Sequence, residues 1–213
     1  MDIRDFFNFA SKLSSSTVQA HAIELDIIPN PSGESSSNSD HNRLIYGDYK
    51  SLHFPILFKQ ESGKRWDDIL DTGWPSLYLI SDRLKRVLKE NKLVGWKAFP
   101  IKLLDKKGNE IPGYHGFSIT GHCGPIDYNK CEIFQKRLVE GGPIRNFYKG
   151  LYVGLDQWDG SDFFHPEGNL GIIVTVKAAD ILKKNKISNI SLRNLSDIET
   201  LESVVKLLEE KGT

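Results

Sequence analysis

The hydrophobic pattern of the chain is clearest between residues 77 and 103. A short apolar run at 77–80 is typical of a buried strand. Apolar residues then recur at three- and four-residue spacing, which places their side chains on one face of a helix; these are Leu84, Val87 and Leu88. A second apolar run at 96–103 closes the segment. The pattern predicts a strand, a helix and a second strand.

The same pattern returns 94 residues later, over residues 171–195. Aligned without a gap, residues 81–93 and 175–187 share four identical positions. Each predicted helix follows a hydroxyl residue, which can accept hydrogen bonds from first-turn amides, and ends in Asn-Lys, which favours a left-handed stop. Any two amphipathic helices can share apolar spacing by chance. The interpretation as a repeat therefore depends on the hydroxyl residue and the Asn-Lys pair that both helices have at their ends. We interpret the two segments as an internal duplication of a strand–helix unit.

Other segments give weaker signals. Residues 6–13 fit a helical stripe, whereas 17–23 alternates as a strand does, so we predict a helix followed by a strand. Residues 29–42 contain five serines and two prolines, which predicts a flexible surface loop outside the core. A turn containing Lys-Lys-Gly-Asn joins the apolar runs 96–104 and 111–120 into a predicted hairpin.

The end of the chain carries a helix-start signal. Ser196 and Glu199 have the spacing of a capping box, and an apolar stripe continues beyond them, which predicts a helix over 197–210. Residues 148–155 read as a strand. Taken together, the elements predict one α+β domain over 1–213, with a mixed, largely antiparallel sheet, two duplicated strand–helix units and a C-terminal helix.

Composition narrows the class of protein. The 213 residues can bury a sizeable core, and 28 basic residues balance 28 acidic ones, so we expect no nucleic-acid partner. No apolar run approaches the roughly 20 residues that span a bilayer, so we expect no membrane partner. Two cysteines are too few for a disulfide framework and no leader pattern opens the chain, which indicates a cytoplasmic protein. Homo-oligomerisation stays open.

Few residues could support chemistry. His122, Cys123 and Cys131 form one group of soft ligands, but a zinc site needs four ligands at close spacing, so we expect no metal. We read them as a loop histidine and two small buried thiols. The sequence contains no phosphate-binding loop, no nucleophile elbow and no cysteine with a matched histidine, so we expect neither a cofactor nor an enzyme.

Acids and aromatic residues alternate over 156–167. Their spacing does not match a calcium loop, and acid–base catalysis would need two carboxylates held apart in a cleft. One hypothesis is therefore an uncharacterised hydrolase or transferase that uses these acids. Another is a partner-binding patch in which aromatic side chains anchor and carboxylates steer, and a third is aromatic packing against the sheet. Our candidate partner-binding residues are Asp156, Trp158, Asp159, Asp162 and Phe163.

Three segments together resemble a known family. Residues 74–81, 158–164, and 173–175 with 189–190 follow one another as in the bacterial immunity-protein-eleven family, which is related to the myxobacterial double-Cys-x-x-Cys-Gly immunity proteins. The resemblance covers about 66–195. It implies a cytoplasmic immunity protein that binds and neutralises a cognate polymorphic toxin, without catalysis of its own. This chain lacks the Cys-x-x-Cys-Gly pair, so no zinc is implied.

Overall fold

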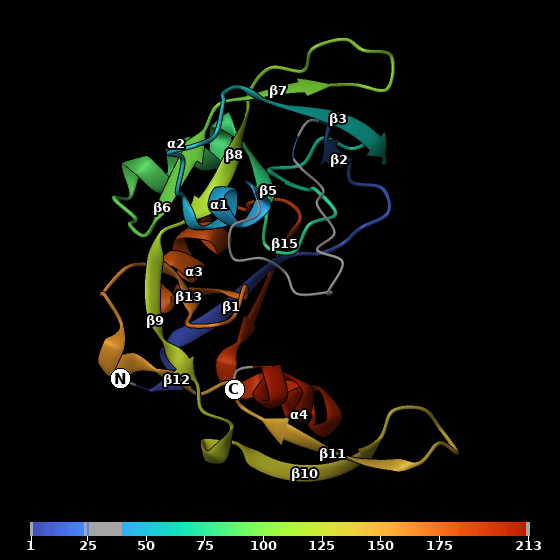
Figure 1. Ribbon diagram of the computed structural model, residues 1–213, viewed down its shortest axis with the longest axis vertical. Coiled ribbons are helices and arrows are strands. Elements are labelled where there is room, and N and C mark those ends of the chain that lie inside the picture. The colour runs from blue at the N-terminus through green and yellow to red at the C-terminus, as the bar shows by residue number, and fades with distance from the viewer. Residues whose placement is uncertain (1, 24, 26–39, 212–213) are drawn as a thin grey trace.

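The computed structural model describes residues 2–23, 25 and 40–211. Most strands lie in two large sheets (Figure 1). Across the seven-stranded sheet the order is β6 (Trp96–Phe99), β8 (Tyr114–Ile119), β5 (Tyr78–Ser81), β4 (Ile69–Asp71), β2 (Gln19–Ala22), β3 (Ile56–Ser62) and β7 (Ile101–Leu104). Across the six-stranded sheet it is β12 (Val153–Gly154), β9 (Gly121–Ile126), β13 (Phe163–Pro166), β14 (Ile172–Thr175), β1 (Phe6–Ser11) and β15 (Ile190–Asn194).

A third, small sheet and the helices complete the fold. The small sheet contains β10 (Glu132–Arg137), β11 (Ile144–Lys149) and β16 (Glu199–Leu201). The α-helices are α1 (Asp40–Tyr46), α2 (Asp82–Glu90), α3 (Val176–Lys184) and α4 (Glu202–Lys211). Short 3-10 turns are η1 (Ile3–Asp5), η2 (Tyr128–Lys130), η3 (Leu155–Gln157) and η4 (Leu195–Asp197). No helix in the described ranges is long and apolar enough to span a membrane.

Strand pairing confirms the predicted fold class. Most neighbouring strands are antiparallel, and the parallel pairs are β2 with β4, β3 with β7, and β9 with β13. Helices α2 and α3 bury their apolar faces in one shared core between the two large sheets, together with side chains of β1, β5, β8 and β14. The chain therefore forms a mixed, largely antiparallel α+β structure with a C-terminal helix.

The six-stranded sheet repeats the topology of the seven-stranded one. The order β6-β8-β5-β4-β2-β3 corresponds to β15-β1-β14-β13-β9-β12, and each pair of neighbours has the same relative direction in both sheets. The register matches too: Ile69 lies opposite Ile80, and 94 residues later Phe163 lies opposite Val174. The repeat thus extends beyond the two strand–helix units recognised in the sequence.

Each half of the chain places its first strand in the sheet of the other half. Strand β1 pairs with β14 and β15, whereas β8 pairs with β5 and β6. Figure 1 shows the blue β1 among the orange and red strands of the second half. Each exchanged strand lies between two strands of the other half, so neither half can complete its sheet alone.

Local signals explain the two equivalent helices. Ser81 Oγ accepts a hydrogen bond from the Leu84 amide, and Thr175 caps its own helix in the same way. At the other end, Asn91 and its counterpart each donate a side-chain hydrogen bond to the carbonyl four residues earlier. The left-handed residue is the lysine that follows, with φ +50° at Lys92, rather than the asparagine itself. The predicted caps are confirmed, and the predicted stop is displaced by one residue.

The predicted N-terminal helix is wrong, because residues 6–11 form β1. Phe7 and Phe9 belong to the core beneath α3, whereas Phe6 packs on the opposite face of the sheet. A strand with apolar contacts on both faces loses strict alternation and can imitate helical spacing. The predicted strand over 17–23 agrees with β2.

The predicted start of the C-terminal helix is also wrong. Glu199 begins β16, which pairs with β11, and α4 starts only at Glu202. The Ser196 hydroxyl contacts Asn194, whose side chain caps the 3-10 turn. Residues 199–201 pair with a strand some fifty residues earlier in the chain. This tertiary contact outweighs the local preference for a helix start.

Three other predictions are corrected in part. The Ser-rich loop over 29–42 lies mostly outside the described residues, but 40–42 begin α1, and His41 and Asn42 are buried. The predicted hairpin is present as β6 with β8, while β7 leaves it to pair with β3. The predicted strand at 148–155 divides into the end of β11 and the two-residue β12.

Candidate functional site

The segment that holds the candidate residues runs from the sheet surface into the sheet. It forms η3, a short loop and then β13, which lies between β9 and β14. Asp156 and Asp159 are exposed and Trp158 is half-buried. Phe163 is fully buried and Asp162 is only 5% exposed. The expectation of exposed contact residues is therefore corrected for Asp162 and Phe163, and partner binding by the segment stays a prediction.

Asp162 is occupied by contacts within the protein. Its carboxylate accepts hydrogen bonds from the Thr175 hydroxyl at 3.1 Å and from the Val94 amide at 3.0 Å, and pairs with Lys177 Nζ at 3.2 Å. Thr175 starts α3, whereas Val94 follows α2. One buried carboxylate thus joins the beginning of the second helix to the end of the first.

Asp68 makes the reciprocal set of contacts, 94 residues earlier. Its carboxylate accepts from the Ser81 hydroxyl at 2.7 Å and the Ser188 amide at 2.8 Å, and pairs with Arg83 at 2.5 Å. Every partner is the 94-residue counterpart of a partner of Asp162. Extending the sequence alignment upstream by thirteen residues would have aligned the two aspartates. We missed this signal.

Trp158 packs against the outer face of the six-stranded sheet. Its ring lies edge-on to Phe6, with centroids 5.4 Å apart, and 5.6 Å from the Phe164 ring. The indole N–H donates to the Ser161 carbonyl oxygen at 3.1 Å. These contacts fit the packing interpretation of the aromatic residues, while the residue as a whole remains partly exposed.

Replacing Trp158 with alanine is expected to lower the free energy of unfolding by about 2 kcal/mol, less than at a fully buried aromatic site, because the ring is only half-buried. Urea unfolding followed by circular dichroism measures the loss. Trp158→Phe keeps ring packing without the indole hydrogen bond and should lose less. An unchanged unfolding midpoint for Trp158→Ala would contradict a packing role and leave the ring available to a partner.

Asp159 organises the loop. Its carboxylate accepts hydrogen bonds from the Ser161 amide at 3.0 Å and from the His122 amide at 3.2 Å. The His122 ring nitrogen lies 3.2 Å away as well. Burial alone would raise the pKa of Asp159, but the hydrogen bonds from Ser161 and His122, with the nearby imidazole, hold that pKa below its usual value. Asp159 is therefore a carboxylate that shapes the loop.

A pocket of about 620 Å³ opens beside this loop. Its lining includes residues of α1, β8, β9, η3 and β13, among them Tyr46, Gln157, His165 and Glu167. His165 donates through Nδ1 to the Gly171 carbonyl oxygen at 3.0 Å, so its Nε2 is an acceptor, and that atom is buried with no partner in the described part of the chain. Burial lowers the pKa of His165 to about 4. The ring of His165 is therefore neutral, and its unpaired acceptor lies buried behind the pocket wall.

The soft-ligand residues do not converge on a metal. Across the described residues, no three His, Cys, Asp or Glu side chains lie close enough to hold an ion. Cys123 is buried as predicted, and burial beside Asp159 raises the pKa of Cys123 to about 12, so it stays a thiol. Cys131 is only half-buried, and His122 is exposed on β9 instead of in a loop.

A family model matches most of the chain. Residues 17–197 match the model of the immunity protein family Imm11. No curated protein matches the chain. The matched region includes both strand–helix units, Asp68, Asp162 and the loop at 156–162.

Proposed function

The chain belongs to the Imm11 immunity protein family, and from that premise we propose that it is a cytoplasmic immunity protein that binds and neutralises a cognate toxin of a polymorphic toxin system. Family membership is the observation that carries the proposal. Neutralisation would be by binding, without a catalytic step. The proposed partner is a protein, and neither nucleic acid nor membrane is part of the proposal.

We propose that the toxin contacts the surface formed by Asp156, the partly exposed Trp158 and Asp159. These are the three candidate residues that reach the surface, and a carboxylate at an interface rim steers a basic partner more than it anchors it. The adjoining pocket adds the exposed carboxylate of Glu167. The combination suits a partner that presents hydrogen-bond donors.

The rival hypothesis of a hydrolase or transferase has less support. A general acid near neutral pH needs a raised pKa, whereas the pKa of Asp159 is lowered. Asp162 is buried and its oxygens already accept hydrogen bonds from Thr175 and Val94. These two acids act as structural acceptors, which removes them from a reactive pair.

Co-expression tests the function. The product of the neighbouring gene, where it is toxic on its own, is expressed in bacteria with and without this protein. We expect restored growth and co-purification of the two proteins. Continued toxicity without co-purification would contradict the immunity function for that pair, while rescue by an unrelated protein would show the assay to be non-specific.

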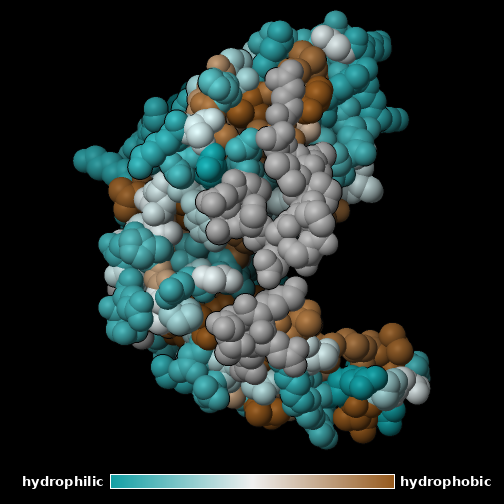
Figure 2. Space-filling model, viewed as in Figure 1, coloured by the Kyte–Doolittle hydropathy of each residue, from teal (hydrophilic) through white to brown (hydrophobic). Residues whose placement is uncertain are grey.

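Single substitutions then test the surface. Asp156→Lys reverses an exposed charge and is expected to slow association with the toxin several-fold at low ionic strength, with little change in dissociation. The matched control is Leu138→Ser on the β10–β11 hairpin, which carries exposed apolar side chains at the projecting end of the molecule (Figure 2). Unchanged association for Asp156→Lys together with lost binding for Leu138→Ser would move the proposed surface to the hairpin.

A further inference from the structure

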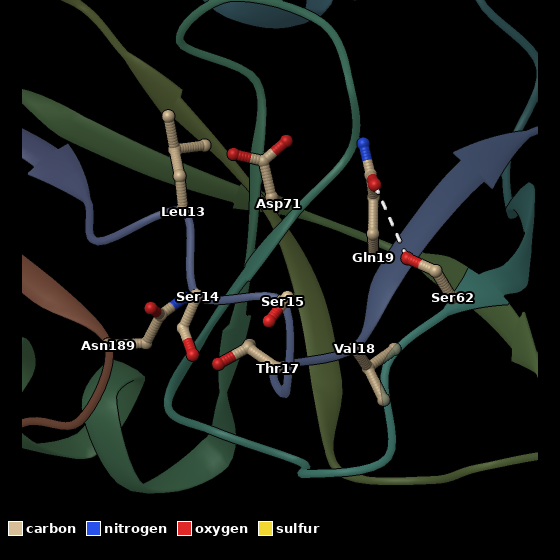
Figure 3. A pocket seen from close by; sticks show the side chains of 9 residues that line it. All are labelled: Leu13, Ser14, Ser15, Thr17, Val18, Gln19, Ser62, Asp71 and Asn189. Atoms are coloured by element: carbon tan, nitrogen blue, oxygen red, sulfur yellow. Dashed lines mark hydrogen bonds between the residues drawn. The ribbon is translucent and has the colours of Figure 1, made fainter.

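The connection between β1 and β2 crosses from one large sheet to the other and opens a pocket of about 190 Å³ (Figure 3). Four segments distant in sequence surround it: the crossover from Leu13 to Gln19, the end of β3 at Ser62, the end of β4 at Asp71, and the turn after α3 at Asn189. In the second half of the chain the corresponding connection is Thr120 alone. The longer crossover of the first half therefore creates this pocket.

Asn189 leaves an acceptor unpaired in the pocket wall. The residue is 5% exposed, and its Nδ2 donates to the Ile69 carbonyl oxygen at 2.8 Å. That bond fixes the orientation of the amide, because flipping it would place oxygen against oxygen. Its Oδ1 has no hydrogen-bond partner among the residues that the structure describes. A buried amide oxygen of this kind requires a donor.

Asp71 adds charge to the same pocket. Its carboxylate accepts hydrogen bonds from the Ser11 hydroxyl at 2.9 Å and from the Gly73 amide at 2.7 Å, both of which are neutral donors. No ion pair within the described ranges includes Asp71. The remaining lining is neutral: Leu13, Ser14, Ser15, Thr17, Val18, Gln19 and Ser62. The pocket therefore offers a carboxylate with no cation in its lining, and its wall holds a buried amide oxygen that lacks a donor among the described residues.

We propose that this pocket binds the cationic end of an arginine or lysine side chain from a partner protein. Asp71 supplies the opposite charge, as charge-assisted recognition requires, and the Ser, Thr and Gln side chains of the lining can accept further hydrogen bonds. Asn189 Oδ1 is covered in this structure, so a small opening of the crossover would bring it to the same donor. The volume lies below the roughly 300–1,000 Å³ of small-molecule sites and suits a single side chain. Leu13, 77% exposed at the rim, provides an apolar contact for the surrounding partner surface. That the partner is the toxin rests on the proposed function, whereas the binding of a cationic side chain by the pocket does not depend on it.

The test uses the full-length protein labelled with ¹⁵N and a matched pair of probes. N-acetyl-arginine methylamide carries the guanidinium, and N-acetyl-citrulline methylamide is its neutral isostere. We expect the arginine probe at millimolar concentration to cause saturable amide shifts in the crossover, at Asp71 and at Asn189. The citrulline probe should bind at least tenfold more weakly.

Two variants test whether the carboxylate of Asp71 attracts the arginine probe. Asp71→Asn keeps an acceptor for the Gly73 amide but removes the carboxylate, and it should weaken binding of the arginine probe at least tenfold. Asp105→Asn, in an exposed turn outside the pocket, should leave binding unchanged.

Equal binding of the two probes, the absence of saturable shifts, or undiminished binding to Asp71→Asn would overturn the proposal and leave a pocket that holds only water. The probe comparison on the unmodified protein decides the matter even where Asp71→Asn fails to fold. Neither result depends on a toxin, so a failed titration and a failed growth rescue are separate outcomes.

Discussion

Replacing Asp162 with alanine should lower the free energy of unfolding by about 3 kcal/mol, because hydrogen bonds to a charged group are worth about 1.5–3 kcal/mol each and a buried donor is left unpaired. The Val94 amide and the Thr175 hydroxyl lose their acceptor, while Lys177 can turn its ammonium group towards water. Urea unfolding of the purified variant measures the loss. A role for Asp162 only as a contact residue predicts unaltered stability instead.

Asp68→Ala is the matched variant and should lose at least as much stability. Asp68 makes the corresponding contacts and in addition accepts from the Ser188 hydroxyl at 3.1 Å. Asp156→Ala, an exposed acid of the same segment as Asp162, serves as the control and should unfold at the wild-type urea concentration. A stability change below about 1 kcal/mol at both buried aspartates would contradict their role in joining the two halves.

Acidification from pH 7 to pH 4.5 should destabilise the protein, chiefly through His165. Burial lowers the folded-state pKa of His165 to about 4, while an unfolded histidine titrates near 6.5. Between these values the unfolded state binds more protons, so stability is complete above about pH 6.5 and falls as the pH decreases towards 4, by up to about 3 kcal/mol. Burial also lowers the pKa of His41, which acts in the same direction.

Urea midpoints measured at pH 7 and pH 4.5 test this dependence. His165→Gln should be less stable than the wild type at pH 7 but should lose much less stability on acidification. The carboxylates of Asp67 and Asp159, whose pKa values are lowered, contribute stability that is lost mainly below about pH 4, outside this interval. Parallel pH profiles for wild type and variant would exclude His165 as the source.

Local sequence signals determined the parts of the fold that depend on local contacts. The helices α2 and α3 begin at Ser81 and Thr175, whose hydroxyls accept from amides three residues later. Such a cap needs only four consecutive residues, so one sequence is enough to predict it. The family resemblance, based on segments within 66–195, was likewise visible in the sequence and agrees with the match over 17–197.

Strand partners could not be read in the same way. Residues 6–11 became β1 because β14 and β15, more than 160 residues away, pair with both edges of that strand. At the other end of the chain, β11 pairs with 199–201 and delays the start of α4. Each outcome depends on hydrogen bonds to a distant strand, which no local window contains.

The sequence by itself determined which residue types occur over 156–167 but not where they point. Phe163 is an interior residue because β13 lies between β9 and β14. Asp162 is buried because Thr175 at the start of α3 and Val94 after α2 donate hydrogen bonds to its carboxylate. The pocket at Asp71 and Asn189 exists only because the crossover, β3, β4 and the turn after α3 meet in space. Burial and unpaired acceptors depend on contacts between segments that are distant in sequence, so tertiary packing decides them. Helix caps and family motifs depend on residues close together in the chain.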